Sequence, residues 1–438
     1  MSVDADLLIV WGIGLGLAVV VTLPFLLHLR RRERGTEQAH LEALRYGLHE
    51  PASLHPVVDT ERCIGIGNCM SVCPEGVLGL RDGQAVAVTP ALCIGHGLCE
   101  RACPVDAITL VFGTEKRGVD IPRVKGNFET NVDGLYVVGE LGGMGLVANA
   151  FEQGRQCVEG IAREGERGPD GLPDLLIVGC GPAGLSAALT ARELGLDALT
   201  LEKEDLGGTV RHYPRKKLVM TRPVKVPGWG KLPFREIRKE ELIGLWEEIA
   251  GETGLEVRVR ETVQNVDRVG PWHFRVRTSQ GVHEARRVVL AIGRRGVPRK
   301  LGVPGEDRAT VHYALREPDA FTGDRLLVVG GGDSAVEAAL SLSEQPENEV
   351  RISYRRSSFR RIKPGNRERI ERAMEDRRVD VLWETEPVEI AEGSVTLARN
   401  GTREPVPADQ VFVFIGGELP SAFLAACGVE IDTKFGEP

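Results

Sequence analysis

The sequence has no excess of basic residues and no low-complexity tract. Its 438 residues include 55 Lys and Arg against 63 Asp and Glu, which gives a net charge of −8. A nucleic-acid-binding protein usually carries a basic excess, so the composition argues against a nucleic-acid partner. Hydrophobic residues make up 42% and charged residues 27%, which is ordinary for a globular protein. The length is sufficient for about two to four domains with proper cores.

An apolar run of about membrane-spanning length occupies residues 7–29. By the positive-inside rule, the arginines that follow it place the N-terminus outside and the rest of the chain in the cytoplasm. A cleaved signal peptide is the alternative, but the basic residues lie on the wrong side and no small-x-small cleavage site follows. We therefore expect a single-pass anchor in the inner membrane at residues 1–34 and a polar, partly helical linker at 35–56. The arginines are Arg30, Arg31, Arg32 and Arg34.

Six of the nine cysteines form an internal repeat, which points to a cluster or metal site rather than a secreted disulfide scaffold. The bacterial ferredoxin fingerprint is C-x2-C-x2-C-x3-C-P. Each half of the repeat matches it except at the second cysteine, where Ile66 and His96 stand. Residues 57–112 thus resemble a small α+β ferredoxin-like domain with up to two iron–sulfur clusters. The six cysteines are Cys63, Cys69, Cys73, Cys93, Cys99 and Cys103.

The resemblance also implies how the ligands are shared, because the cysteine before the proline binds the other cluster. One cluster would be held by Cys63, Cys69 and Cys103; the other would be held by Cys93, Cys99 and Cys73, with His96 available for the fourth corner. Because Ile66 cannot bind iron, the first cluster is either [3Fe–4S] or [4Fe–4S] with an open or exogenous ligand. His96 remains either a ligand or an exposed loop residue. Structural zinc is disfavoured, because zinc sites pair cysteines more closely, and a domain without clusters is the other alternative.

A first glycine-rich loop, G-x-G-x-x-G, follows an expected strand at 174–179 and precedes a helix at 185–194. The glycines admit a pyrophosphate, and an acidic residue after the next strand, at 198–201, can bind ribose hydroxyls. The Gly-Gly-Thr turn that follows is similar to the turn that lies against the flavin in thioredoxin-reductase-like flavoproteins. We assign this site to FAD. Its residues are Gly179, Gly181, Pro182, Ala183, Gly184, Glu202, Gly207, Gly208 and Thr209.

A second glycine-rich loop follows the expected strand at 325–329 and precedes a helix that extends through Leu342. The next strand, 349–354, ends in an arginine pair instead of an acid, which favours the 2′-phosphate of NADPH over NADH. The block YRRSSFR also resembles the NADPH-selecting block of thioredoxin reductases. The alternative is a solvated basic helix, which suits the later arginines. The assigned residues are Gly330, Gly332, Asp333, Ser334, Ala335, Arg355, Arg356 and Arg360.

Residues 119–161 contain a segment that comes last in flavoproteins with two dinucleotide domains: a strand at 135–138, the turn Gly139-Glu140 and a helix directed at the flavin. Here the segment precedes the FAD loop, and the chain ends where that segment is expected. We interpret this order as a circular permutation, which succeeds where the original termini lie close together. The alternative is a truncated chain with a duplicated segment.

The expected fold class is therefore α/β, with two Rossmann-like dinucleotide-binding domains, the ferredoxin-like domain and one N-terminal transmembrane helix. The FAD-binding domain would comprise 113–320 and 411–438, and the NADPH-binding domain 321–410. This part of the chain is similar to thioredoxin reductases and bacillithiol disulfide reductases. The stretch Val303–Asp324, where thioredoxin reductases carry C-x-x-C, contains no cysteine, so a dithiol relay is not expected.

The resemblance implies that NADPH reduces FAD and that electrons pass through the clusters to a ferredoxin-like protein or a membrane, quinone-side acceptor. Hydride transfer needs alignment and exclusion of water, so no catalytic acid or base is assigned. A reductase of a small disulfide is the second hypothesis, with residues 212–217 lining its pocket or forming an ordinary loop. An iron–sulfur redox sensor is the third. A homodimer is left open.

Overall fold

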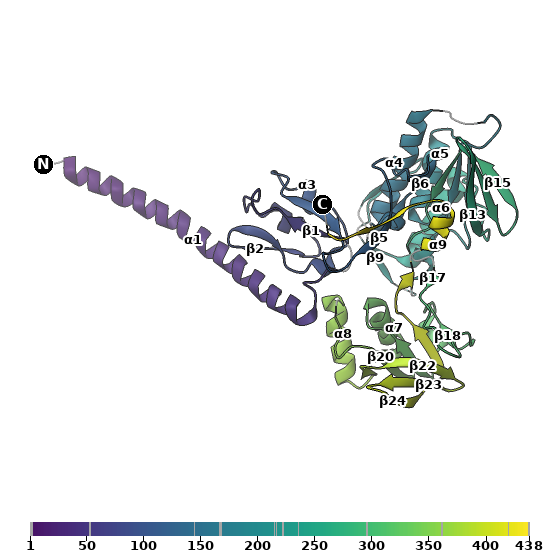
Figure 1. Cartoon of the computed structure of the whole chain (residues 1–438). Helices are drawn as coiled ribbons and strands as arrows, with labels where there is room; N and C mark the ends of the chain where they lie inside the picture. The colour runs from purple at the N-terminus through teal and green to yellow at the C-terminus, as the bar shows by residue number, and fades with distance from the viewer. Residues whose placement is uncertain are drawn as a thin grey trace. The chain divides into compact units, whose positions relative to one another are not determined.

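The computed structural model separates the chain into two compact units, Met1–Gly113 with Gly436–Pro438 and Thr114–Phe435 (Figure 1). Each unit is described by itself. The described residues are 3–51, 54–143, 145–165, 169–213, 215, 217–220, 223–234, 236–294, 297–360, 362–418 and 420–436.

The first unit begins with α1 (Val3–Tyr46), a long helix that contains Pro24. This helix continues through Tyr46, so much of the expected linker at 35–56 is helical. Within the described part of the chain, no helix combines the length and the apolar character needed to cross a bilayer. The expected transmembrane span is therefore not confirmed.

A small α+β domain follows α1 in the first unit. β1 (Leu54–Val58) pairs antiparallel with β4 (Ile108–Phe112), so the domain begins a few residues before the expected position 57. Its other elements are the hairpin of β2 (Leu78–Arg81) and β3 (Gln84–Ala87), the short helices α2 (Asn68–Ser71) and α3 (Leu98–Arg101), and η1 (Pro90–Leu92). Its small core contains Cys69, Leu78, Ala85, Cys99 and Ile108. Two of the six repeat cysteines are thus part of the core.

The second unit is built around two parallel sheets. The first sheet has the order β6-β16-β7-β8, and all its pairs are parallel. β6, β7 and β16 are buried on both faces, which explains their largely apolar sequences. The strands are β6 (Leu135–Val137), β16 (Arg287–Leu290), β7 (Leu175–Val178) and β8 (Ala198–Leu201).

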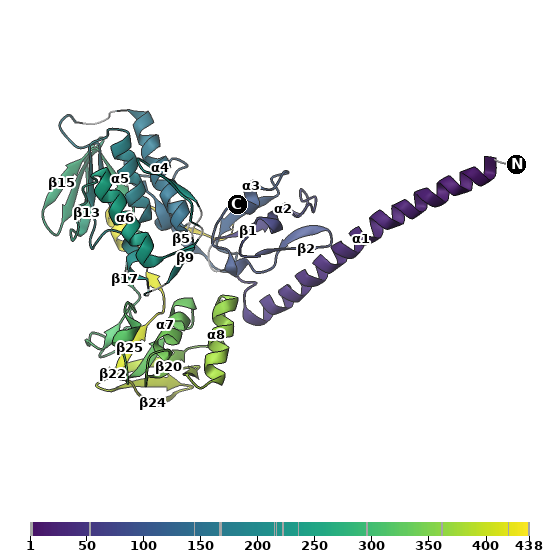
Figure 2. The same ribbon diagram turned by 180° about the vertical axis from the view of Figure 1, so that it is seen from behind.

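Two helices on the first sheet, α4 (Val147–Glu164) and α5 (Pro182–Glu193), lie side by side (Figure 2). Their contact depends on Gly154, where a Cβ would lie only 2.1 Å from the Ala183 carbonyl oxygen. The other elements of this region are η2 (Gly139–Gly142), η3 (Gly208–His212), β9 (Leu218–Met220), β10 (Val224–Val226), β11 (Gly230–Leu232), β12 (Glu236–Arg238), α6 (Lys239–Thr253), β13 (Val263–Gly270), β14 (His273–Thr278) and β15 (Val282–Ala285).

The second sheet has the order β18-β25-β19-β20-β21 and is also parallel. It extends beyond the expected bounds of 321–410, because β18 at 311–312 and the last residues of β25 pair within it. Its strands are β18 (Val311–His312), β25 (Gln410–Val413), β19 (Arg325–Val329), β20 (Glu349–Tyr354) and β21 (Val379–Trp383). Around it are η4 (Pro318–Ala320), α7 (Asp333–Ser343), α8 (Pro364–Glu375), β22 (Glu386–Ala391), β23 (Ser394–Arg399) and β24 (Thr402–Pro407); β17 (Val297–Pro298), β26 (Gly417–Glu418) and α9 (Ser421–Ala426) complete the list.

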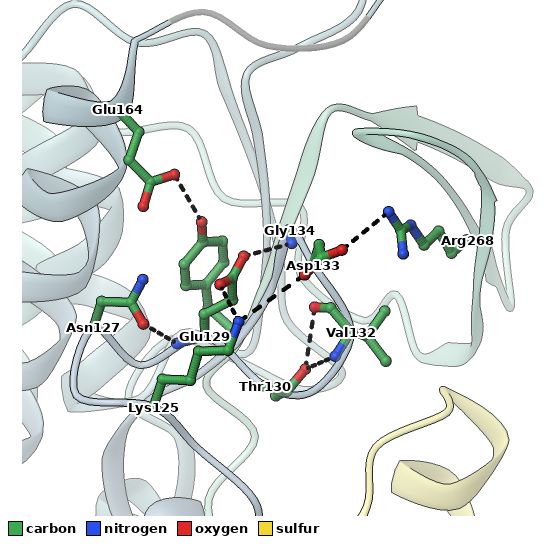
Figure 3. A network of polar contacts seen from close by, with 10 residues as sticks. Lys125, Asn127, Glu129, Thr130, Val132, Asp133, Gly134, Glu164 and Arg268 are labelled. Atoms are coloured by element: carbon green, nitrogen blue, oxygen red, sulfur yellow. Dashed lines mark hydrogen bonds and ion pairs between the residues drawn. The ribbon is translucent and has the colours of Figure 1, made fainter.

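The segment that precedes the first glycine loop is an integral part of the second unit. β6 is the edge strand of the first sheet, and β5 (Val119–Pro122) pairs with β27 (Ile431–Lys434), the last strand of the chain. A polar network holds the intervening turn (Figure 3). In it, the buried Glu129 carboxylate accepts hydrogen bonds from Lys125 Nζ at 2.8 Å and Gly134 N at 3.0 Å.

Candidate cofactor sites

The first candidate site lies in the small domain, where Cys63, Cys69 and Cys103 line one cavity together with Ile66. Backbone N–H groups donate to two of these sulfurs: Ala85 N lies 3.4 Å from Cys63 Sγ, and Ala107 N lies 3.2 Å from Cys103 Sγ. Such hydrogen bonds stabilise a thiolate. The three side chains are therefore grouped as the ferredoxin fingerprint predicts, and their surroundings suit iron ligands.

The second candidate site contains Cys73, Cys93, Cys99 and His96, which line a separate cavity. Burial raises the pKa of Cys93 to about 11. It also raises the pKa of Cys99 and the pKa of Cys69 in the first site. Buried thiols of this kind ionise when they bind a metal, and the binding then releases protons. The cysteine before each proline thus joins the opposite loop, as expected.

Glycines allow these loops to close tightly. Gly65 has φ +68°, and a Cβ there would lie 1.9 Å from the Gly83 carbonyl oxygen. Among the described residues, no three or more Cys, His, Asp or Glu side chains are grouped so that they could hold a metal ion. The ligands of an iron–sulfur cluster lie farther apart than the ligands of a single metal ion, because each iron of the cluster binds its own thiolate. Ligation by the six cysteines and His96 stays a prediction.

The first glycine-rich loop lies at the carboxyl end of β7, where α5 begins at Pro182 after Gly181. Close packing requires two of its glycines: a Cβ would lie 2.7 Å from the Ala291 carbonyl oxygen at Gly179, and 1.8 Å from the Gly179 carbonyl oxygen at Gly184. The helix N-terminus is thereby presented to the space above the loop, where it favours the negative charge of a pyrophosphate.

Two separate turns approach this loop. A Cβ on Gly208 would lie 3.0 Å from Gly181 Cα, so the Gly207-Gly208-Thr209 turn lies against the loop. The segment that precedes the loop contributes the turn at Gly139-Glu140, where a Cβ on Gly139 would lie 3.0 Å from Ala183 Cβ. The structure thus brings together the glycine-rich loop and the two turns that the sequence assigned to FAD.

Glu202 follows β8 and is 4% exposed. Its carboxylate accepts hydrogen bonds from Cys180 N at 2.6 Å and Glu204 N at 3.1 Å, so it also holds the glycine-rich loop in place. Each carboxylate oxygen has a further lone pair, which leaves capacity for a ribose hydroxyl. The sequence predicted the ribose contact, whereas this role in the loop was not foreseen.

Gln153 is a site residue that the sequence gave no reason to select. It is 8% exposed, and its Oε1 accepts a hydrogen bond from Gly139 N at 2.8 Å. The signal that could have identified it is a polar side chain on the buried face of α4, directly before Gly154. Gln153 fixes the Gly139 turn over the first loop.

The second glycine-rich loop follows β19, and α7 begins at Asp333 after Gly332. A Cβ on Gly330 would lie 2.4 Å from the Phe414 carbonyl oxygen. Asp333 Oδ1 accepts hydrogen bonds from Lys363 N at 2.9 Å and Asn366 Nδ2 at 2.7 Å. Ser334 and Ala335 complete the first turn of the helix.

The expected phosphate-binding arginines follow β20, the strand next to β19 in the second sheet. Arg355, Arg356 and Arg360 are exposed. None of the three forms an ion pair with a carboxylate in the part of the chain that the structure describes. Their charges are therefore available to an anion near the loop.

The stretch 212–217, expected to be either a substrate pocket or an ordinary loop, makes several ion pairs. His212 Nε2 lies 2.6 Å from Glu204, Arg215 contacts Glu317 and Asp319, and Lys217 Nζ lies 2.8 Å from Glu337. Pro214 and Lys216 lie outside the described residues. These ion pairs favour the interpretation as a structural loop.

Comparison with known proteins agrees with this geometry. The 4Fe-4S dicluster domain family matches residues 55–104, and the pyridine nucleotide-disulphide oxidoreductase family matches residues 176–438. A ferredoxin–NADP reductase of Ignicoccus hospitalis is 35% identical over 60% of this chain and 83% of its own length. The bacilliredoxin reductase Bdr of Bacillus subtilis is 28% identical over 60% and 82%, respectively.

Among solved structures, the bacillithiol disulfide reductase Bdr of Staphylococcus aureus has a TM-score of 0.54 at 26% identity, and covers 59% of this chain and 81% of that one. The fold is thus α/β and Rossmann-like, and the cofactors are FAD, NADPH and 4Fe–4S clusters. The enzyme is a flavin-dependent oxidoreductase that uses a nicotinamide nucleotide, and the chain belongs to the pyridine nucleotide-disulphide oxidoreductase family.

Proposed function

We propose that this enzyme carries electrons between NADPH, FAD and the iron–sulfur clusters, and delivers them to a ferredoxin-type or membrane acceptor. Bound FAD would supply the exchange between the two-electron chemistry of NADPH and the one-electron chemistry of the clusters. The observation that supports this route is the presence of two separate cysteine cavities in the same chain as two dinucleotide loops. The relative named ferredoxin–NADP reductase supports the choice of acceptor class.

The chain's own residues position these groups. The loop at Gly179–Gly184 and the turn held by Gln153 enclose the flavin side, and Arg355 with Arg356 would pair with the 2′-phosphate. The six cysteine thiolates would hold the clusters at the two cavities of the small domain. We assign no acid or base at the nicotinamide site, since hydride transfer would need alignment and exclusion of water from these residues.

An anaerobic titration with NADPH tests the route, with flavin and cluster spectra followed together. We expect flavin bleaching followed by loss of the cluster absorbance. A Cys99→Ala variant should still bleach its flavin but should reduce fewer clusters per chain. Bleaching of the wild-type flavin without any cluster reduction would refute the route.

A second candidate function, the reduction of a small disulfide, is favoured by the similarity to bacillithiol disulfide reductases. NADPH turnover with low-molecular-weight disulfides that survives Cys99→Ala would support it. Because Val303–Asp324 lacks the C-x-x-C pair, such a reaction would not use the dithiol relay of thioredoxin reductases.

We further propose that the chain is a circular permutant, and that it is anchored at the inner membrane with its cofactor domains in the cytoplasm. The permutation is supported by the pairing of β6 with β16 and of β5 with the terminal β27. The location rests on the apolar run and the arginines after it. Fractionation of cells into membrane and soluble material tests the location.

A further inference from the structure

The last part of α1 is held firmly against the β2–β3 hairpin of the small domain. Thr36 is 8% exposed; its Oγ1 donates to the Arg32 carbonyl oxygen at 3.0 Å and accepts from Leu80 N at 3.0 Å. One turn earlier, Glu33 Oε1 accepts from Gly83 N at 3.3 Å. A Cβ on Gly79 would lie 2.6 Å from Thr36 Cγ2, which shows how closely the helix approaches the strand. The rotation of α1 at Arg32 is therefore fixed.

The same hairpin supports the loop of the first cluster cavity. A Cβ on Gly65 would lie 1.9 Å from the Gly83 carbonyl oxygen, and Ala85 N donates to Cys63 Sγ at 3.4 Å. The hairpin thus lies between α1 on one side and the loop on the other. A side chain of α1 that reaches past the hairpin meets the cluster loop directly.

Arg32 makes this contact. A Cβ built on Gly67 would lie 3.3 Å from Arg32 Nη1 and 3.7 Å from Nη2, so the guanidinium lies over the residue that follows Ile66. Arg32 is half-buried, and in the described part of the chain no carboxylate forms an ion pair with it. Its charge is therefore not neutralised by a partner.

Among the described residues, no side chain makes the equivalent contact at the second cavity. Gly97, which occupies the position of Gly67 in the second half of the repeat, would meet nothing within 4 Å of a Cβ. The charges near this cavity are mixed: the carboxylates of Glu75 and Glu100 act on Cys93 and Cys99, respectively, while Arg101 Nη2 donates to the His96 carbonyl oxygen at 3.2 Å. These two acids and one base sum to −1 at the second cavity.

We propose that Arg32 is a positioning residue that raises the reduction potential of the first cluster above that of the second. Reduction adds one negative charge to a cluster, and a nearby cation stabilises the reduced form. The first cluster would then be the favoured destination of electrons within the chain. This inference rests on the proposed binding of clusters at the two cavities, but not on the route from NADPH.

The test is a redox titration with chemical mediators, followed by EPR and visible spectra of the whole chain. Arg32→Gln should lower the reduction potential of the first cluster, whereas in Arg32→Lys, which keeps the positive charge, the potential should stay near the wild-type value. For a unit charge near the cluster we expect roughly a three- to tenfold change in the oxidised-to-reduced ratio at fixed potential. A tenfold change corresponds to about 59 mV for a one-electron couple. The second cluster, identified by the signal lost in Cys99→Ala, should not move.

Arg34→Gln is the matched control, because it removes the same charge from an exposed position two residues along the helix. An equal shift in Arg34→Gln and Arg32→Gln, or no shift in Arg32→Gln, would overturn the proposal. So would loss of first-cluster iron in Arg32→Gln but not in Arg32→Lys, since the arginine would then hold the loop rather than set the potential. The mediators reduce the clusters directly, so a failure of NADPH to reduce them leaves this measurement intact.

Discussion

Replacement of Gly154 by alanine tests whether α4, which precedes the FAD loop in sequence, packs on the helix of that loop. A Cβ at position 154 would lie 2.1 Å from the Ala183 carbonyl oxygen and 3.0 Å from Ala187 N. Both are backbone atoms of α5, so the clash is relieved only if the two helices move apart. Overpacking of this kind costs about 1–3 kcal/mol or more.

A second glycine in the same helix supplies the control. At Gly160 a Cβ would meet only the end of the Arg163 side chain, at 4.0 Å. Gly160→Ala should therefore show only the gain in helix propensity, about 1 kcal/mol. Gly154→Ala has the same gain in helix propensity, but its new Cβ clashes with α5. Gly160→Ala should therefore stabilise the protein, whereas Gly154→Ala should destabilise it.

Thermal unfolding and FAD content per chain measure the two effects. Because Gly139 lies next to Ala183 and is held by Gln153, separation of the helices should also lower FAD retention in Gly154→Ala. Gly160→Ala should retain FAD at the wild-type level. If both variants unfold at or above the wild-type temperature with full FAD, α4 does not pack on α5 as described.

Three further predictions concern the other sites. Replacing both Arg355 and Arg356 by alanine should raise KM for NADPH about 10- to 100-fold, because charge-assisted hydrogen bonds to the phosphate are lost. In steady-state kinetics, KM for NADH, which lacks that phosphate, should change little. An equal rise in KM for both nucleotides would contradict the assignment. Cys93→Ser should remove the iron and sulfide of one cluster only, as counted after anaerobic purification, and loss of both clusters would contradict two separate sites. The Arg325 guanidinium lowers the pKa of Asp409 to about 2, so this pair contributes stability above about pH 4 that is lost as the pH falls towards 2. In Asp409→Asn, the free energy of unfolding should therefore depend less on pH in that range. An unchanged pH dependence in this variant would contradict the prediction.

The two dinucleotide loops were predictable because each signal is local. β8, β19 and β20 have the bounds expected from the sequence, since each apolar run ends at a glycine turn or a charged residue. The grouping of the cysteines was also predictable, because in the ferredoxin fingerprint the cysteine that precedes a proline belongs with the loop of the other half. Other features depend on tertiary contacts. β18 has only two residues and β25 lies far from it in sequence, so their pairing in the second sheet left no periodic signal.

The contact of Arg32 with Gly67 illustrates the same limit. In the sequence, Arg32 belongs to a group of arginines after an apolar run, and the positive-inside rule explains the group without distinguishing its members. Only the register of Thr36 against Leu80 selects which arginine faces the cluster loop. The helix rotation is a property of packing, and no spacing within residues 30–34 contains it.

The first and last strands of the second unit, β5 and β27, pair with each other. Arg123, just after β5, forms ion pairs with Glu430 and Asp432 beside and within β27, about 300 residues later in the sequence. Gly118 adds a steric constraint, since a Cβ there would lie 2.3 Å from Thr433 Cγ2. The two ends of this unit therefore meet as adjacent strands. A covalent link between them would give the order in which this segment follows the second sheet, and this is the order that the proposed circular permutation starts from.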